Sequence, residues 1–150
     1  MRRVMLLAMV ALLGCAPRGV RVVTSSGVET VDELCRRHPL ATGANIRADE
    51  IARSTSASIH LIQVRGGEAP HRHATHDLSV TVLRGEGILR LAGTTQALHA
   101  GDVAVVPRGA THWFTRGGAD VAVALAVFSP PLDAPDTVPI DDVDSPAAAR

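Results

Sequence analysis

The sequence has no tyrosine and no lysine, and its only large aromatic residues are one tryptophan and two phenylalanines. Without lysine no Schiff base can form, and without tyrosine no phenol can act as a catalytic acid. Positive charge is not in excess either, because lysine and arginine together number 15 and the acidic residues also number 15. A chain with no basic surplus lacks the charge that binds phosphate backbones, so we expect no nucleic-acid partner.

Long hydrophobic runs are also missing. The apolar stretch near the N-terminus, Val4 to Leu13, would span about 15 Å as a helix, whereas the hydrocarbon core of a bilayer is about 30 Å thick. Arg2 and Arg3 precede this stretch and supply a positive N-terminal region. The segment is therefore typical of a secretory signal peptide and not of a membrane span.

The end of the apolar stretch, Leu12-Leu13-Gly14-Cys15, resembles a bacterial lipobox. This resemblance predicts that residues 1–14 are a lipoprotein signal peptide and that lipid on Cys15 anchors the protein to a membrane. Ala16 stands where an aspartate would resemble an inner-membrane retention signal, which favours the periplasmic face of the outer membrane in the bacterial envelope. Cys35 would then be the one remaining thiol and could form no internal disulfide. An ordinary secretory signal with a chance cysteine is the alternative.

Composition divides the rest of the chain. With 150 residues, 46% of them apolar, the chain is long enough for one domain with a buried core. Residues 15–29 carry Pro, Gly and Ser and predict a tether. The folded domain is expected over residues 30–132. Residues 133–150 are rich in Pro and Asp and predict an irregular C-terminal tail that partly wraps the domain and is partly disordered.

Local signals predict one short helix followed by many strands. Thr30 and Glu33 fit a capping box and Pro39 lies just beyond a basic last turn, so a helix is expected at about 31–37. Residues 45–53 fit either a helical turn or an edge strand. Further along, glycine-separated strands are expected at about 58–65, 71–83, 87–92, 95–99, 102–106, 111–115 and 119–128. This all-β pattern is typical of a sandwich or a small barrel.

Two histidine-bearing motifs lie in this β-rich region. The first is HRHATHD, which begins at His71, and the second is GDVAVVPRGATH, from Gly101 to His112. They resemble the two motifs of the cupin superfamily, roughly G-x5-H-x-H-x3-4-E-x6-G and G-x5-P-x-G-x2-H-x3-N. The second motif matches without a gap, and the first supplies both histidines and the closing Gly85. The resemblance covers about residues 58–128 and implies a cupin jelly-roll barrel.

The resemblance and the spacing point to one metal site. His71 and His73 are two residues apart, so on a strand they project from the same face. His112 follows a turn that directs its imidazole back toward the barrel, and Gly109 in that turn is expected to need unusual backbone dihedrals. Three imidazoles suit a divalent transition metal, with Zn, Fe, Mn, Ni or Cu left open. A chance histidine pair on a solvated strand is the alternative.

The fourth ligand of the family pattern is missing. Leu78 stands where the motif places a glutamate. Strict alternation puts Leu78, Val80 and Val82 on one face of the strand together with His76, so that Asp77 would face outward. The shorter family spacing would instead make Asp77 the ligand. A site with three histidine ligands is therefore the main expectation.

The spacing does not fix the role of two further residues of the first motif. His76 or Asp77 is the candidate proton carrier, or a fourth metal ligand if a β-bulge intervenes. Asp77 could equally be a carboxylate that orients a ligand histidine. Glu68 is the only other carboxylate close to the motif in sequence.

The activity is not determined by the resemblance, since one fold hosts many functions. A metal with three histidine ligands keeps positions open for a substrate or O2, which implies a dioxygenase or an isomerase. A non-catalytic envelope module that binds a small ligand or a metal is the alternative, and a degenerate structural site is a third. The inward-facing residues are mostly Val, Leu, Ile and Ala, so a small hydrophobic ligand is expected. Many cupins pair through sheet edges, and the resemblance thus implies a homodimer.

Overall fold

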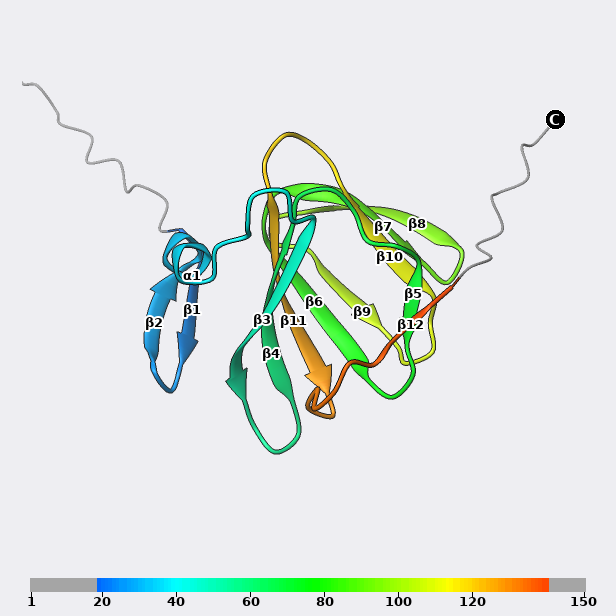
Figure 1. The fold of residues 1–150 in the computed structure, drawn as a ribbon, viewed down its shortest axis with the longest axis horizontal. Helices are drawn as coiled ribbons and strands as arrows, with labels where there is room; N and C mark the ends of the chain where they lie inside the picture. The colour runs from blue at the N-terminus through cyan, green and yellow to red at the C-terminus, as the bar shows by residue number, and fades with distance from the viewer. Residues whose placement is uncertain (1–18, 141–150) are drawn as a thin grey trace, which may run out of the picture.

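The computed structural model describes residues 19–140, which form two facing β-sheets with a small N-terminal unit beside them (Figure 1). The predicted signal peptide, Cys15 and residues 141–150 lie outside the described residues. Within the described part, no helix is long and apolar enough to cross a membrane. The elements are β1 (Arg21–Thr24), β2 (Gly27–Thr30), α1 (Val31–Arg37), β3 (Ile46–Arg53), β4 (Ser58–Val64), β5 (His71–His73), β6 (Asp77–Arg84), β7 (Glu86–Leu91), β8 (Thr94–His99), β9 (Val103–Val106), β10 (His112–Arg116), β11 (Ala122–Ser129) and β12 (Thr137–Pro139).

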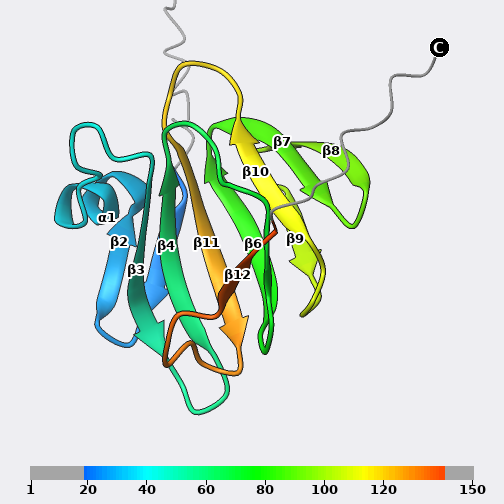
Figure 2. The same ribbon diagram turned by 45° about the vertical axis from the view of Figure 1, so that its right-hand side comes forward.

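The two main sheets have five strands each. The first sheet has the order β3-β4-β11-β6-β9, and the second has the order β12-β5-β10-β7-β8. Neighbouring strands are antiparallel, and most neighbours are distant in sequence because the chain crosses repeatedly between the sheets. Figure 2 shows β11 in the middle of the first sheet, between β4 and β6. This arrangement is the jelly roll, and the all-β prediction is confirmed.

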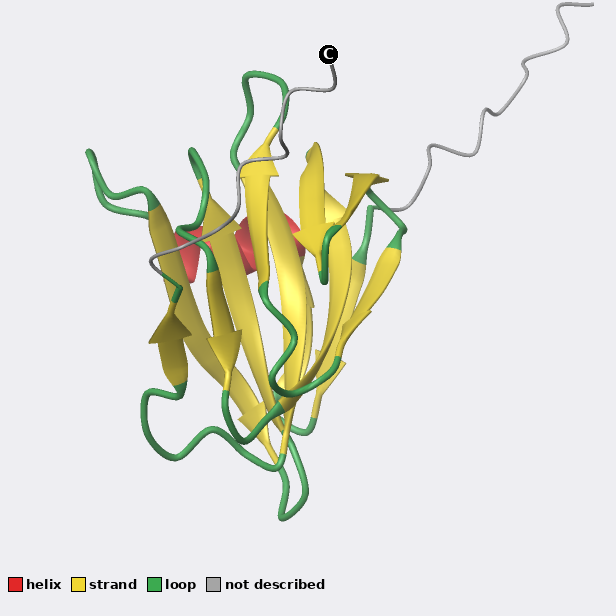
Figure 3. Ribbon diagram, turned by 90° about the vertical axis from the view of Figure 1, so that its right-hand side faces the viewer, coloured by secondary structure: helices red, strands yellow, loops and turns green. Residues whose placement is uncertain are grey.

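The helix lies where the sequence predicts it. The hydroxyl oxygen of Thr30 accepts the N–H of Glu33 at 3.2 Å, and a carboxylate oxygen of Glu33 accepts the N–H of Thr30 at 2.8 Å, which completes the capping box. Val31 and Leu34 then pack against the first sheet, in a cluster with Leu61, Leu83 and Val123. Figure 3 shows the helix behind the strands, on the far side of that sheet from the second one.

The opposite face of the first sheet points into the space between the sheets. Leu78, Val106, Ala126 and Phe128 form a second buried cluster there. Because side chains alternate along a strand, Leu61 of β4 faces the helix while its neighbour Ile62 faces the interior. The first sheet therefore has apolar contacts on both faces, and its inner face becomes one wall of the interior.

Two segments differ from the local predictions, and a third, left ambiguous by the sequence, takes one of its two expected forms. The strand expected over 71–83 is two strands, β5 and β6, separated by residues 74–76. Most of the predicted tether is ordered: β1 and β2 form a hairpin in which Val22 packs against the helix cluster. The ambiguous residues 45–53 form β3, which is an edge strand of the first sheet.

The chain after β11 connects the two sheets. Residues 130–140, which we name the C-terminal strap, leave the end of β11 and enter β12 (Figure 2). There β12 pairs with β5, with Thr137 opposite His73 and Pro139 opposite His71. The strap thus runs from the first sheet to the strand that carries two of the predicted metal ligands.

Candidate metal centre

The structure brings His71, His73 and His112 together. One ring nitrogen of each lies within 4.8 Å of the others, and no other group of three or more His, Cys, Asp or Glu side chains in residues 19–140 meets this spacing. The ring centroids of His71 and His112 are 4.3 Å apart, and both rings lie about 5 Å from that of His73. These three side chains are therefore placed to hold one metal ion.

Local backbone structure explains this convergence. β5 presents the HxH pair, and β10 pairs with it so that His112 lies directly opposite His71. The turn before His112 is attached to β5, because the N–H of Gly109 donates to the carbonyl of His73 at 2.7 Å. Gly109 has φ +79°, a left-handed conformation that L-residues rarely adopt, so the expectation of unusual dihedrals is confirmed.

Backbone carbonyls fix the orientation of two of the three rings. Nδ1 of His71 donates to the carbonyl of Ala69 at 2.9 Å, and Nδ1 of His112 donates to the carbonyl of Ala110 at 3.0 Å. A carbonyl only accepts, so each of these rings has a proton on Nδ1, and in the uncharged form of the ring Nε2 carries the free lone pair. Histidine ligands of metals are commonly held in this way.

His73 differs from the other two. Its Nδ1 is buried without a hydrogen-bond partner, and no other side-chain nitrogen or oxygen between residues 19 and 140 is in that state. Burial and the adjacent His112 and His71 lower the pKa of His73 to about 4, and burial also lowers the pKa of His112. Both rings are thus uncharged at neutral pH, the form that binds metals. An orphaned nitrogen among neutral imidazoles fits a metal ion.

The histidines border a large interior cavity. It has a volume of about 760 Å³, and side chains from both sheets and from the strap line it. Most of the lining residues are Val, Leu, Ile, Ala and Pro, with Phe114 and Phe128 as the aromatic ones. Leu78 lies in this wall, buried, where the family pattern has a glutamate. No carboxylate replaces it beside the three histidines, so the donor set in the described residues consists of imidazoles.

The structure places His76 and Asp77 elsewhere. Neither lines the cavity and neither belongs to the histidine group. Nδ1 of His76 lies 2.5 Å from a carboxylate oxygen of Asp136, and its Nε2 lies 3.3 Å from the carbonyl of Pro131. His76 is buried and its ring packs edge-on against Phe128 of the inner cluster, on the side that alternation predicts. Its two ring nitrogens contact the strap, however, and it stands outside the histidine group.

Asp77 faces outward, as alternation predicts, but it does not orient a histidine. Its carboxylate accepts the backbone N–H of Arg108 at 2.9 Å and pairs with the guanidinium of Arg108 at 2.7 Å. The side-chain and backbone hydrogen bonds from Arg108 lower the pKa of Asp77. Asp77 thereby fixes the start of the turn that leads to His112.

Asp136 is a residue of this region that the sequence motifs do not indicate. Its carboxylate accepts the N–H groups of Ala74 and Thr75 at 3.2 and 3.0 Å, in addition to the contact with His76. Burial opposes ionisation, but the hydrogen bonds from His76 and Thr75 prevail and lower the pKa of Asp136 to about 2. The strap is thereby bound to the turn that directly follows His73.

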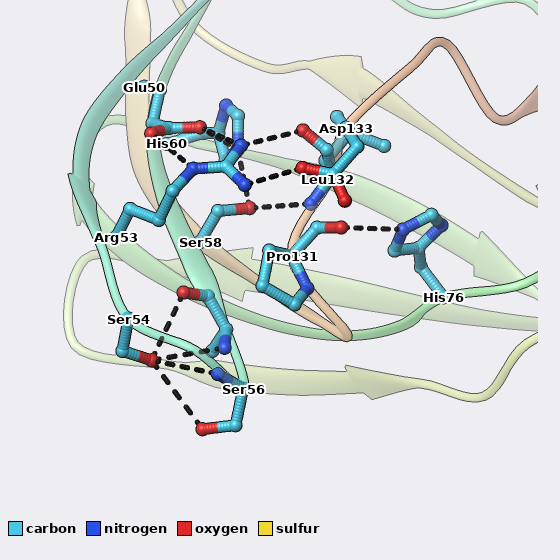
Figure 4. A network of polar contacts seen from close by, with 11 residues as sticks. Glu50, Arg53, Ser54, Ser56, Ser58, His60, His76, Pro131, Leu132 and Asp133 are labelled. Carbon is cyan, nitrogen blue, oxygen red and sulfur yellow. Dashed lines mark hydrogen bonds and ion pairs between the residues drawn. The ribbon is translucent and has the colours of Figure 1, made fainter.

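The other end of the strap is anchored at the tips of β3 and β4. Figure 4 shows the backbone N–H of Leu132 directed at the hydroxyl of Ser58, a hydrogen bond of 3.0 Å. Arg53 donates to Asp133 at 2.6 Å, and His60 pairs with the same Ser58 hydroxyl at 2.9 Å. His60 is thus a buried structural histidine in the described structure.

Glu68 is the second residue whose position the motifs do not indicate. It lines the cavity, and one of its carboxylate oxygens accepts the N–H of Phe114 at 2.9 Å. Burial raises the pKa of Glu68. Its place three residues before His71 is the only sequence signal that could have drawn attention to it.

Comparisons with known proteins agree with this fold. A family model described as Cupin domain matches residues 58–128. An uncharacterized protein of Aquifex aeolicus (strain VF5) is 34% identical over 114 residues, which are 76% of this chain and 93% of that protein. The structure of KdgF from Halomonas sp. is similar with a TM-score of 0.58 and 25% identity, covering 65% of this chain and 91% of that chain. The match to Pac13, a nucleoside dehydratase of Streptomyces, has a TM-score of 0.54 at 17% identity and covers 64% of this chain and 78% of Pac13. At this identity the match shows a shared fold alone.

Proposed function

The chain belongs to the cupin superfamily, and we propose that it binds one divalent transition metal at His71, His73 and His112 beside a pocket for a small organic ligand. The observation that carries the proposal is the convergence of three ring nitrogens within 4.8 Å at the wall of a cavity of about 760 Å³. The neutral state of His73 and the orphaned Nδ1 of that ring support it.

We propose further that the site is catalytic, of the oxygenase or isomerase type. Three protein ligands leave coordination positions open, and open positions distinguish catalytic from structural metal sites. A metal bound there would supply Lewis acidity or redox chemistry, depending on which ion it is. The chain's own residues hold that position, exclude water with an apolar wall and present Glu68 as a polar group inside the cavity.

A non-catalytic binding module is the second candidate function. The observation in its favour is the shortage of acid–base groups, since neither His76 nor Asp77 lines the cavity and Asp136 is occupied by three donors. Catalysis would then have to rely on the metal and Glu68. Incubation of the loaded protein with candidate substrates, with O2 consumption and product formation as readouts, separates the two candidates.

For the location we propose a lipid anchor at Cys15 in the bacterial envelope. The hairpin that begins at Arg21 lies six residues after Cys15, a distance of at most about 20 Å for an extended chain. Val23 and Val28 are paired across this hairpin and are exposed. Cys15→Ser should release the protein from the membrane fraction, and equal fractionation of wild type and variant would contradict the proposal.

Metal content is the measurement that tests the proposed site. Elemental analysis of the purified wild type should give close to one transition metal ion per chain, and His71→Ala, His73→Ala and His112→Ala should each lose it. His99→Ala serves as a matched control that should retain metal, because its side chain is 64% exposed and lies outside the group. His76→Ala and Asp77→Ala test the fourth-ligand alternative separately, and both should retain metal because neither residue belongs to the group. A wild type that holds no metal after reconstitution would refute the site.

A further inference from the structure

The cavity described above has a charge pattern that restricts its ligand. Apolar side chains from both sheets form most of its wall, including Ile62 and Val80 of the first sheet and Leu89 and Phe114 of the second. The polar part of the wall is confined to Asn45, the histidines, the segment around Glu68 and the strap. A ligand inside the cavity therefore exchanges water for hydrocarbon over most of its surface.

No basic side chain other than histidine lines this cavity in residues 19–140, and lysine is absent from the whole sequence. The arginine that reaches the strap, Arg53, is already paired with Glu50 and Asp133. Arginine, lysine and helix N-termini are the groups that usually receive carboxylates, sulfonates and phosphates. The one helix of the described chain packs on the opposite face of the first sheet. An anionic ligand body would therefore have no partner here.

The charges that do reach the cavity are acidic. Glu68, Asp133 and Asp136 are among the lining residues. Ionised carboxylates repel an anion, and the groups that could offset them, Arg53 beside Asp133 and His76 beside Asp136, are already engaged by these two side chains. An anion moved from water to this wall would lose its hydration without compensation, which is costly.

The size of the cavity supports an organic molecule and not a small ion. Binding pockets for small molecules usually have about 300–1,000 Å³, and the volume here, about 760 Å³, lies within that range. A compact polar anion would leave most of the apolar wall uncovered. A molecule with an extended hydrocarbon body would cover it.

We infer that the cavity takes an uncharged, largely apolar organic molecule and selects against ligands whose body carries a carboxylate, sulfonate or phosphate. Only the end that faces His71, His73 and His112 can be polar, and this part of the inference rests on the proposed metal function. The preference for an uncharged body rests on the wall alone and holds with or without metal.

The test uses two fluorescent probes that differ by one sulfonate group: uncharged N-phenyl-1-naphthylamine and anionic 8-anilinonaphthalene-1-sulfonate. Both are titrated into the metal-free full chain carrying Cys15→Ser, which cannot be acylated. The uncharged probe should bind at least about tenfold more tightly than the sulfonate, because the anion finds no counter-charge in the wall.

A pair of matched variants places the binding in the cavity. Ile46→Lys adds a cation at a lining position that is 42% exposed, so the change should not disturb folding. Val105→Lys makes the same kind of change at a residue that is 64% exposed and does not line the cavity. Ile46→Lys should tighten sulfonate binding by about fivefold through its charge, and Val105→Lys should leave it unchanged.

Three results would overturn the inference: no binding of the uncharged probe, equal or tighter binding of the sulfonate by the wild type, or the same response from both lysine variants. Metal content of the same preparations is measured separately. Loss of the proposed metal function would appear there, without altering the preference between the two probes.

Discussion

The attachment of the C-terminal strap gives a prediction with a magnitude that follows from the structure. Asp136 receives three donors, from the backbone of Ala74 and Thr75 and from the ring of His76. The substitution Asp136→Asn keeps the shape of the side chain but removes its charge and turns an N–H group toward these donors. At least two of the three hydrogen bonds are then weakened or lost.

Each hydrogen bond to a charged group contributes about 1.5 kcal/mol or more, so the free energy of unfolding should fall by about 3 kcal/mol. For a domain of this size the melting temperature changes by about 4 °C per kcal/mol, which corresponds to a decrease of about 12 °C. The affected region is specific: the strap and the turn after β5 should lose protection from hydrogen exchange, whereas β4 and β11 in the first sheet should keep it.

Urea and thermal unfolding of the metal-free protein at neutral pH measure this effect. Asp133→Asn is the matched control, because it removes the other aspartate of the strap that forms an ion pair, with Arg53. The side chain of Asp133 is 83% exposed, and surface pairs of this kind contribute about 0–1 kcal/mol. Equal losses in the two variants, or a loss below about 1 kcal/mol in Asp136→Asn, would refute the view that this carboxylate holds the strap.

Three further predictions follow from the site and its supports. The pKa of Asp136 falls from 3.8 to about 2 on folding, so its carboxylate stabilises the protein above about pH 4. The difference in unfolding free energy between wild type and Asp136→Asn should therefore shrink as the pH falls from 4 to 2. Leu78→Glu should lower the stability of the metal-free protein by about 2–4 kcal/mol, since it places a carboxyl in an apolar cluster. The same change should raise metal affinity by at least about tenfold, measured by titration calorimetry with Co2+. No gain in affinity would mean that position 78 does not face the histidines. A Cβ at Gly87 would overlap the ring of Phe114 and the carbonyl of Thr115. Gly87→Ala should therefore lower the free energy of unfolding, measured in urea, by about 2 kcal/mol or more. An unchanged free energy would mean that β7 and β10 are less closely packed than the structure shows.

The parts of the site that the sequence predicts are those set by short-range geometry. His71 and His73 share a face because successive side chains alternate on a strand, and two positions bring them back to the same side. His112 follows from the Pro107 to Gly109 turn, whose positive φ at Gly109 depends only on local backbone structure. These local features are predicted by the motifs, whereas the meeting of His112 with His71 and His73 also needs the pairing of β10 with β5, which was expected from the family resemblance.

The parts that the sequence does not predict depend on long-range contacts. The break between β5 and β6 arises because Asp136, about sixty residues later, takes the N–H groups of Ala74 and Thr75 that a continuous strand would use in its ladder. His76 then turns toward the strap. The hairpin of β1 and β2 had a local signal, because Ser25-Ser26 separates two short β-prone runs, but the Gly and Ser content suggested a tether instead. The break in the strand is thus decided by a contact from outside the segment, whereas the hairpin was missed although its pairing is local.

The leucine at position 78 links the two proposals made for this protein. In the family pattern a glutamate would stand here, adding a fourth ligand and one negative charge to the metal. With Leu78 the three imidazoles contribute no charge, so a bound divalent ion would keep its full positive charge and its open positions toward the cavity. The same leucine continues the apolar wall beside Val106, Ala126 and Phe128. A ligand that satisfies both surfaces needs an oxygen or nitrogen donor at one end, directed at the histidines, and an uncharged hydrocarbon body against β6 and β11. The absence of the glutamate therefore sets the orientation of the ligand in the cavity. Its donor end lies at β5 and β10, and its apolar end lies at the first sheet.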